Sequence, residues 1–139
     1  MRASARISLA PTASEVSRFN TWFDQKCTDR GIGRRLAGDL KLCINEVLAN
    51  AISYGFKCTA NPWVTVKIQL DKRRASATII DNGSYFDLSK WQVPKDRDLT
   101  TGEPGGFGIA LIKERAGAIR YSRFCGRNHL KIVCEEADP

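Results

Sequence analysis

Residues 42–56, LCINEVLANAISYGF, carry an acid and an amide four positions apart, Glu46 and Asn50, inside an otherwise apolar stretch. Apolar residues recur around them at the spacing of an amphipathic helix, which predicts a helix over residues 36–54 with Gly55 as its terminator. Because residues i and i+4 lie on one helical face, the two polar side chains present their oxygens side by side. A carboxylate at the edge of a core costs free energy unless a polar group meets it, so we expect a polar pocket over this helix.

Two interpretations of the pair follow from these residues alone. The first is a solvated acid and amide on the exposed flank of an amphipathic helix, with Cys43 and Ser53 continuing their line. The second is a site, since an amide oxygen is a hard ligand suited to Mg²⁺ and a carboxylate can take a proton from a hydroxyl or orient water.

The sequence on either side predicts the remaining elements. Residues 2–10 alternate weakly up to Pro11, which indicates a first strand at an edge of the sheet. Thr12 followed by Glu15 is a capping box that opens a helix ending near Gly31. Further strands are predicted over residues 63–70 and 75–81, an irregular loop over 87–104, a helix from the glycines at 105–108, and a closing hairpin over 119–135.

This order predicts an α+β fold. We expect a two-layer α/β sandwich in which a mixed, mostly antiparallel sheet is covered by helices on one face. Residues 1–139 carry no internal repeat or linker, so a single domain is expected.

Composition narrows the class of protein. The chain has ordinary globular composition, with no apolar run near the ~20 residues that span a bilayer and no secretory signal, so we expect a cytoplasmic protein. Five cysteines without a C-x-x-C pair, beside one histidine, favour reduced thiols over structural zinc. The net charge of +7 suggests an acidic partner, whether nucleic acid, lipid surface or protein, although scattered basic residues are also typical of a solvated surface.

Two further stretches carry chemistry. In DNGSYFD, Asp81 closes a strand and Gly83 follows at the turn; the pattern is common in turns, yet such a carboxylate can also accept a hydrogen bond from an exocyclic amine. In EPGGFGIALI, glycines let the backbone approach an anion at a helix N-terminus, or simply form a flexible loop before a helix: Gly105, Gly106 and Gly108.

The three stretches together resemble a known family. NEVLANAISYGF, DNGSYF and GGFGIALI, in that order, resemble the N, G1 and G2 boxes of the histidine-kinase-like (GHKL) ATPases, which share the Bergerat fold. The short chain and the D-x-G-x-x-F form of the second box resemble the anti-sigma factor serine kinases in particular. This family resemblance covers nearly the whole chain.

The resemblance implies ATP and Mg²⁺ as cofactors and gives each site residue a role. Glu46 would be the general base on a substrate serine, Asn50 would hold Mg²⁺, and Asp81 would bind the adenine amine. Gly83 would keep the wall beside the base open, and residues 87–104 would form the ATP lid. The phosphates would be wrapped by Gly105, Gly106 and Gly108.

The resemblance also implies partners. Such kinases bind a sigma factor or similar effector and phosphorylate a small anti-anti-sigma antagonist, with Arg18 in the contact region and dimerisation through the sheet and first helix. Tyr54 and Tyr85 depart from the family pattern, at positions where many relatives carry histidine and glycine. The alternatives are a sequestering module that binds nucleotide without kinase activity, and a basic nucleic-acid binder; the resemblance implies neither nucleic acid nor membrane as a partner.

Overall fold

The computed structural model of the chain describes residues 3–90 and 106–137. The strands are β1 (Ala3–Leu9), β2 (Val64–Leu70), β3 (Arg74–Asp81), β4 (Ala118–Phe124) and β5 (Arg127–Glu135). The helices are α1 (Ala13–Asp29), α2 (Arg34–Asn50), the π-helical η1 (Ala51–Gly55), the 3-10 turn η2 (Leu88–Lys90) and α3 (Gly106–Arg115). The element order agrees with the order predicted from the sequence.

The five strands form one sheet in the order β1-β2-β3-β5-β4, with β1 at an edge. Every neighbouring pair is antiparallel. The expectation of a mixed sheet is therefore wrong in one respect, because no two neighbouring strands of this sheet are parallel. Strands β3 and β4 run in the same direction, but β5 lies between them. Helix α3 returns the chain to the start of β4, and the β4–β5 hairpin then places β5 between β4 and β3.

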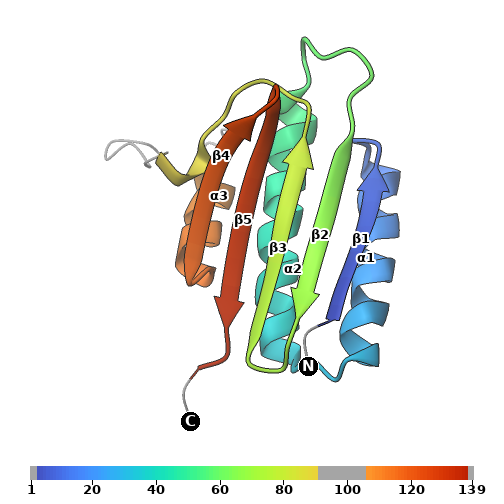
Figure 1. Ribbon diagram of the computed structural model, residues 1–139, viewed down its shortest axis with the longest axis vertical. Coiled ribbons are helices and arrows are strands. Elements are labelled where there is room, and N and C mark those ends of the chain that lie inside the picture. Colours follow the sequence, from blue (N-terminus) through green and yellow to red (C-terminus); the bar gives the residue numbers. More distant parts are fainter. Residues whose placement is uncertain (1–2, 91–105, 138–139) are drawn as a thin grey trace.

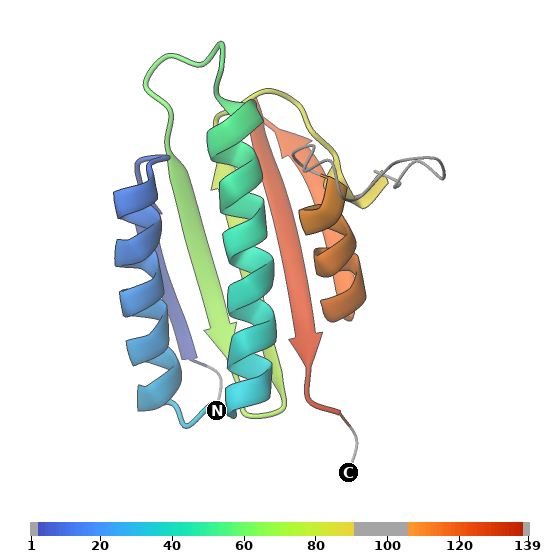
Figure 2. The same ribbon diagram turned by 180° about the vertical axis from the view of Figure 1, so that it is seen from behind.

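All three α-helices cover the same face of the sheet, as Figure 2 shows from the helical side. The opposite face carries no helix and is turned to the viewer in Figure 1. The two-layer sandwich predicted from the sequence is confirmed. Among the described residues, no helix is long and apolar enough to cross a membrane.

Helix α1 begins as the sequence predicts. The Thr12 hydroxyl accepts a hydrogen bond from the Glu15 N–H at 3.3 Å, which caps the first turn. The reciprocal half of the capping box differs: the Glu15 carboxylate accepts from the N–H of Ala10, because the Thr12 N–H already donates to the carbonyl of Ala10. The capping pair thus also fixes the chain between β1 and α1.

The core lies between the helices and the inner face of the sheet. Helix α2 crosses the centre of the sheet (Figure 2) and contributes the largest buried face of any described helix: Leu36, Leu40, Cys43, Ile44, Val47 and Leu48. Cys43 therefore does not continue the polar line of Glu46 and Asn50. It is fully buried, and a hydrogen bond with Cys134 of β5 raises the pKa of its thiol. All five cysteines are free thiols.

Candidate functional site

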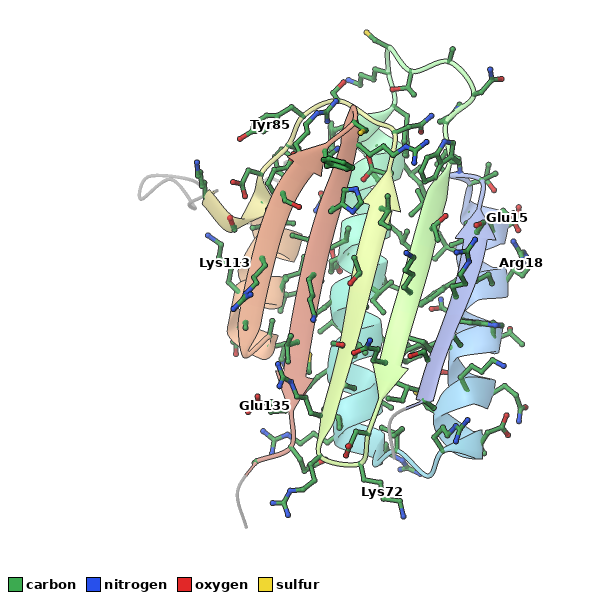
Figure 3. The ribbon with its side chains drawn as sticks, in the orientation of Figure 1. Glu15, Arg18, Lys72, Tyr85, Lys113 and Glu135 are labelled. Carbon is green, nitrogen blue, oxygen red and sulfur yellow. The ribbon has the colours of Figure 1, made fainter. Side chains whose placement is uncertain are left out.

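A cavity of about 300 Å³ opens where α2 passes into η1 and β3 ends. Tyr85, labelled near the upper end of the molecule in Figure 3, belongs to its wall. Most of the wall is apolar, with Val47, Ile79 and Ile109 among its members, and a small number of polar groups converge on it. This combination is typical of a small-molecule site, and the volume lies at the small end of the usual range.

Asp81 is brought to the cavity by its place at the end of β3, as the sequence predicts. Its Oδ1 accepts hydrogen bonds from the Gly83 N–H at 2.8 Å and from Nδ2 of Asn128 at 3.0 Å. Among the described residues, none donates to the other carboxylate oxygen. The carboxylate is thus held in one orientation and keeps acceptor capacity for a ligand.

Asn128 of β5 is a site residue that sequence reasoning missed. It is 7% exposed, and Nδ2 also donates to the Ser84 carbonyl at 2.8 Å, while Oδ1 accepts from Tyr121 and Arg123. Burial raises the pKa of the Tyr121 phenol above its ordinary value, so that group stays protonated and donates. A signal was available, because Asn128 occupies an inward position of a strand whose next inward residues are apolar.

Gly83 is required by a close approach of two chain segments. A Cβ at this position would lie 2.6 Å from the Gly55 carbonyl oxygen and 3.0 Å from Oδ1 of Asp81. The same carbonyl accepts a hydrogen bond from the Ser84 N–H at 2.9 Å. The turn after β3 is therefore fastened to the end of η1, and any larger residue would separate the two walls of the cavity.

Asn50 is the last residue of α2 and lines the cavity beside η1. Its Nδ2 is buried and has no hydrogen-bond partner among the described residues. A buried amide without a partner costs free energy, so this group fits a missing ligand. The π-helical turn that follows is a geometry often found at functional sites; it carries the chain from α2 to the contact with Gly83.

Glu46 lies one turn before Asn50, half-buried, and is not part of the cavity wall. A Cβ added at Gly108 of α3 would overlap with Oε2 of Glu46, so the carboxylate lies directly against the backbone of this glycine. The site residues predicted from the sequence thus form two neighbouring groups. Asn50 and Asp81 line the cavity, while Glu46 and Gly108 contact each other beside it.

The remaining glycines and the lid are only partly described. Gly106 is the first residue of α3, whereas Gly105 and residues 91–104 of the expected lid lie outside the described residues. In the described part of the expected lid, Asp87 accepts a hydrogen bond from the Ser89 N–H at 3.0 Å, and Leu88 is buried in the cavity wall.

The two tyrosines that depart from the family pattern both line the cavity. Tyr85 is 61% exposed and meets Tyr121 edge to face, with ring centroids 5.6 Å apart. Tyr54 lies in η1, with the Lys57 ammonium 5.6 Å from its ring centroid. Two aromatic rings therefore line the cavity, where they can contact a planar ligand.

The described residues contain no cluster of three or more His, Cys, Asp or Glu side chains that could hold a metal ion. The Asn50 amide is the fitting metal contact in the cavity, because turning the carboxamide presents its oxygen in place of the partnerless nitrogen. A cation held by one protein oxygen needs further oxygens from a bound ligand, as is usual for Mg²⁺ at phosphates.

Comparison with known proteins decides the family. The histidine kinase-like ATPase domain family matches residues 9–134. The chain belongs to this family. Within it, the chain is 28% identical to the serine/threonine-protein kinase BtrW of Bordetella bronchiseptica over 132 residues, which cover 94% of this chain and 93% of that one. It is 27% identical to the serine-protein kinase RsbW of Listeria innocua over 82 residues, 54% of this chain and 51% of that one.

A solved structure supports the histidine kinase-like fold. The structure of the RsbU and RsbW domains of a Mycobacterium tuberculosis protein superposes with a TM-score of 0.67 at 15% identity, covering 99% of this chain and 33% of that one. The resemblance stated from the three sequence boxes is thus confirmed at the level of family and fold. The relatives matched by sequence are named as protein kinases, and this histidine kinase-like ATPase domain spans about half of the RsbW chain.

Proposed function

We propose that this protein is an ATP-dependent serine kinase of the anti-sigma factor type. The observation that supports the proposal best is the convergence of Asn50 and Asp81 on one largely apolar cavity. The family match and the kinase names of the relatives agree with it. These two side chains belong to α2 and β3, segments far apart in sequence, and a merely solvated helix flank would not bring them to a shared cavity.

In the proposed site, the adenine base enters the apolar cavity and its exocyclic amine donates to the Asp81 carboxylate. Asn128 holds that carboxylate through its bond to Oδ1, and Gly83 keeps the wall open. Asn50 would hold Mg²⁺, which when bound would neutralise phosphate charge. In the proposal, the phosphates are wrapped by Gly106 and Gly108 of α3 and by Gly105, which lies outside the described residues.

Glu46 is the proposed general base that takes the proton from the substrate serine hydroxyl. Its carboxylate lies against Gly108 at the start of α3, beside the cavity and one turn from Asn50. A carboxylate in that place can meet a hydroxyl that approaches the phosphate end of the nucleotide. Catalysis would then come mostly from positioning and from charge neutralisation.

The proposed partners are a small anti-anti-sigma antagonist as phosphoacceptor and a sigma factor or similar effector, in a cytoplasmic partner switch. We include a homodimer in the proposal. Arg18 is a candidate contact on α1, where its guanidinium is held by Glu15 (Nε to Oε2, 2.6 Å) and by the Ser8 carbonyl. Both Glu15 and Arg18 are labelled at the outer edge of Figure 3.

The test combines calorimetry with turnover. The protein should bind Mg-ATP and transfer labelled phosphate to a serine of its cognate antagonist protein, while Asp81→Asn should weaken nucleotide binding. Absence of nucleotide binding by the native protein would overturn the proposal. Tight nucleotide binding without phosphate transfer would favour the alternative, a sequestering module. The Tyr85 side chain in the cavity wall departs from the family pattern and is compatible with that alternative.

A further inference from the structure

The open face of the sheet carries a line of basic residues that the nucleotide site does not use. The strand registers place Arg6 opposite Lys67, Lys67 opposite Thr78, Thr78 opposite Lys131, and Lys131 opposite Arg120. One residue from each strand therefore lies on a single line across the sheet. We call this line the cationic row: Arg6, Lys67, Thr78, Lys131 and Arg120.

The cationic row faces solvent on the side away from the helices, the side seen in Figure 1. Its four basic side chains are exposed, and none forms an ion pair with any residue within 3–90 or 106–137. Neighbouring strands lie about 4.8 Å apart, so the row spans about 19 Å. That length matches a short polypeptide segment laid across the strands.

The rows on either side of the cationic row carry no charge. Along one side lie Ser4, Gln69, Ser76, Val133 and Ala118. Along the other lie Ser8, Thr65, Ile80, His129 and Ser122. The described carboxylates near this face include Glu135, at one end of the sheet, where it pairs with Arg74 at 3.9 Å, and Asp71, which lines a hollow together with Lys131. Among the described residues, no carboxylate forms an ion pair with a basic side chain of the row.

Folding gives no reason for this arrangement. Like charges directly opposite each other on neighbouring strands are destabilising, and the row contains two such pairs, Arg6 with Lys67 and Lys131 with Arg120. A solvated surface would spread these charges or alternate them with acids. An acidic partner is expected to offset the repulsion between these like charges when it binds to the row.

A hollow of about 240 Å³ lies beside the middle of the row, on the side of the β2–β3 turn. It is lined by Gln69, Asp71, Arg73, Arg74, Ser76 and Lys131. Asp71 uses its Oδ1 to accept from the Arg73 N–H at 3.1 Å. Lys131 belongs to both the row and the hollow, so a partner on the row can continue into it.

We propose that the cationic row is a docking surface for an acidic protein segment, on the opposite side of the sheet from the nucleotide cavity. A protein is favoured over single-stranded nucleic acid because the row and its flanking rows offer a base one ring for stacking, His129, and that residue is half-buried. A second copy packed face to face on this surface is disfavoured because it would bring cation against cation, so the proposed homodimer would form at the β1 edge of the sheet and α1 instead. Such a partner would leave the nucleotide cavity open.

The test uses a matched pair of variants of the full chain. The row variant carries Arg6→Gln, Lys67→Gln, Arg120→Gln and Lys131→Gln. The control variant removes the same number of arginines and lysines from the helical side and the loops, at three exposed positions and at the half-buried Lys26: Lys26→Gln, Arg30→Gln, Arg35→Gln and Lys72→Gln. Both variants have the same net charge, so only the place of the lost charges differs.

Binding is measured by fluorescence anisotropy with a labelled polyglutamate peptide, an oligo(dT) strand and phosphatidylserine vesicles. We expect the native protein to bind the peptide, the row variant to bind it about tenfold or more weakly, and the control variant to bind like the native protein. Equal loss in both variants, no peptide binding, or tighter row-dependent binding of the oligonucleotide or vesicles would overturn the proposal.

Thermal unfolding of the same variants gives a second readout. If the like charges of the row repel one another in the free protein, their replacement by glutamine should raise the unfolding temperature. Polyglutamate should stabilise the native protein but not the row variant. A lower unfolding temperature for the row variant would assign these side chains to the fold and overturn the proposal. Neither measurement depends on nucleotide, so the outcome is separate from that of the kinase proposal.

Discussion

Helices α1 and α2 have the same length, 17 residues each, and lie on the same face of the sheet, yet different forces hold them. Helix α1 has a side-chain cap at Thr12, an acid in its first turn and three buried residues. Helix α2 has no side-chain cap and no first-turn acid, but buries six residues. Local interactions at its first turn therefore stabilise α1, whereas burial stabilises α2. The last turn of α2 ends at the candidate site residue Asn50.

The two helices are also joined by polar contacts. Asn20 of α1 and Asn45 of α2 exchange reciprocal amide hydrogen bonds at 3.1 and 2.8 Å. Lys41 of α2 pairs with Asp24 of α1 at 3.0 Å. These contacts fix the helical layer, so substitutions on one helix can be compared with matched substitutions on the other.

The largest effect on phosphate transfer is expected from replacing the acid of α2, Glu46, and not from replacing the acid of α1, Glu15. Glu46→Gln should lower the rate of phosphate transfer about 100- to 10,000-fold by removing the general base, while nucleotide binding stays unchanged. Transfer from labelled ATP under single-turnover conditions measures this. The matched change on α1, Glu15→Gln, should leave the chemical step unchanged. Equal rates for Glu46→Gln and the native protein would remove Glu46 from catalysis.

Burial at the centre of α2 should dominate stability. Ile44 is fully buried, and Ile44→Ala should lower the free energy of unfolding by about 2–5 kcal/mol because it leaves a cavity. Val16→Ala on the half-buried face of α1 should cost less. Urea denaturation of both variants measures the difference, and a larger loss at Val16 would refute the contrast between the helices.

A smaller effect should follow from filling the space between α2 and α3. Gly108→Ala should displace the Glu46 carboxylate and lower phosphate transfer by about 10- to 100-fold, without loss of thermal stability because alanine favours a helix. Gly38→Ala in α2 is the control, since no atom lies within 4 Å of its added Cβ. If both alanine variants retained full transfer rates, the contact between Gly108 and Glu46 would have no catalytic importance.

The smallest effect should come from the cap of α1. Thr12→Ala should lower the free energy of unfolding by about 1 kcal/mol, because the Glu15 N–H loses its acceptor. Thr12→Ser should restore most of this, and urea denaturation measures both. Since no cavity residue belongs to α1, nucleotide affinity should not change; a change would mean that the α1 cap and the site are coupled.

Much of the fold could be predicted because its signals are local. The alternation in β2 and the Thr12 cap each act within a few residues. The π-helical widening after Asn50 could not be predicted, since it depends on the contact between Gly55 and Gly83. Cys43 was misplaced because its orientation is set by packing against Cys134 of β5, far along the chain.

The sequence by itself determined the order of the elements and the family resemblance, and it gave Asn50 and Asp81 as candidate site residues, because periodicity, capping and motif spacing are properties of neighbouring residues. Only the tertiary structure decided that Asn50 and Asp81 share a cavity, that Asn128 orients Asp81, and that Glu46 rests against Gly108 instead. Strand register likewise aligned the four cations of the row. Such long-range contacts depend on how distant segments pack, which no local pattern encodes.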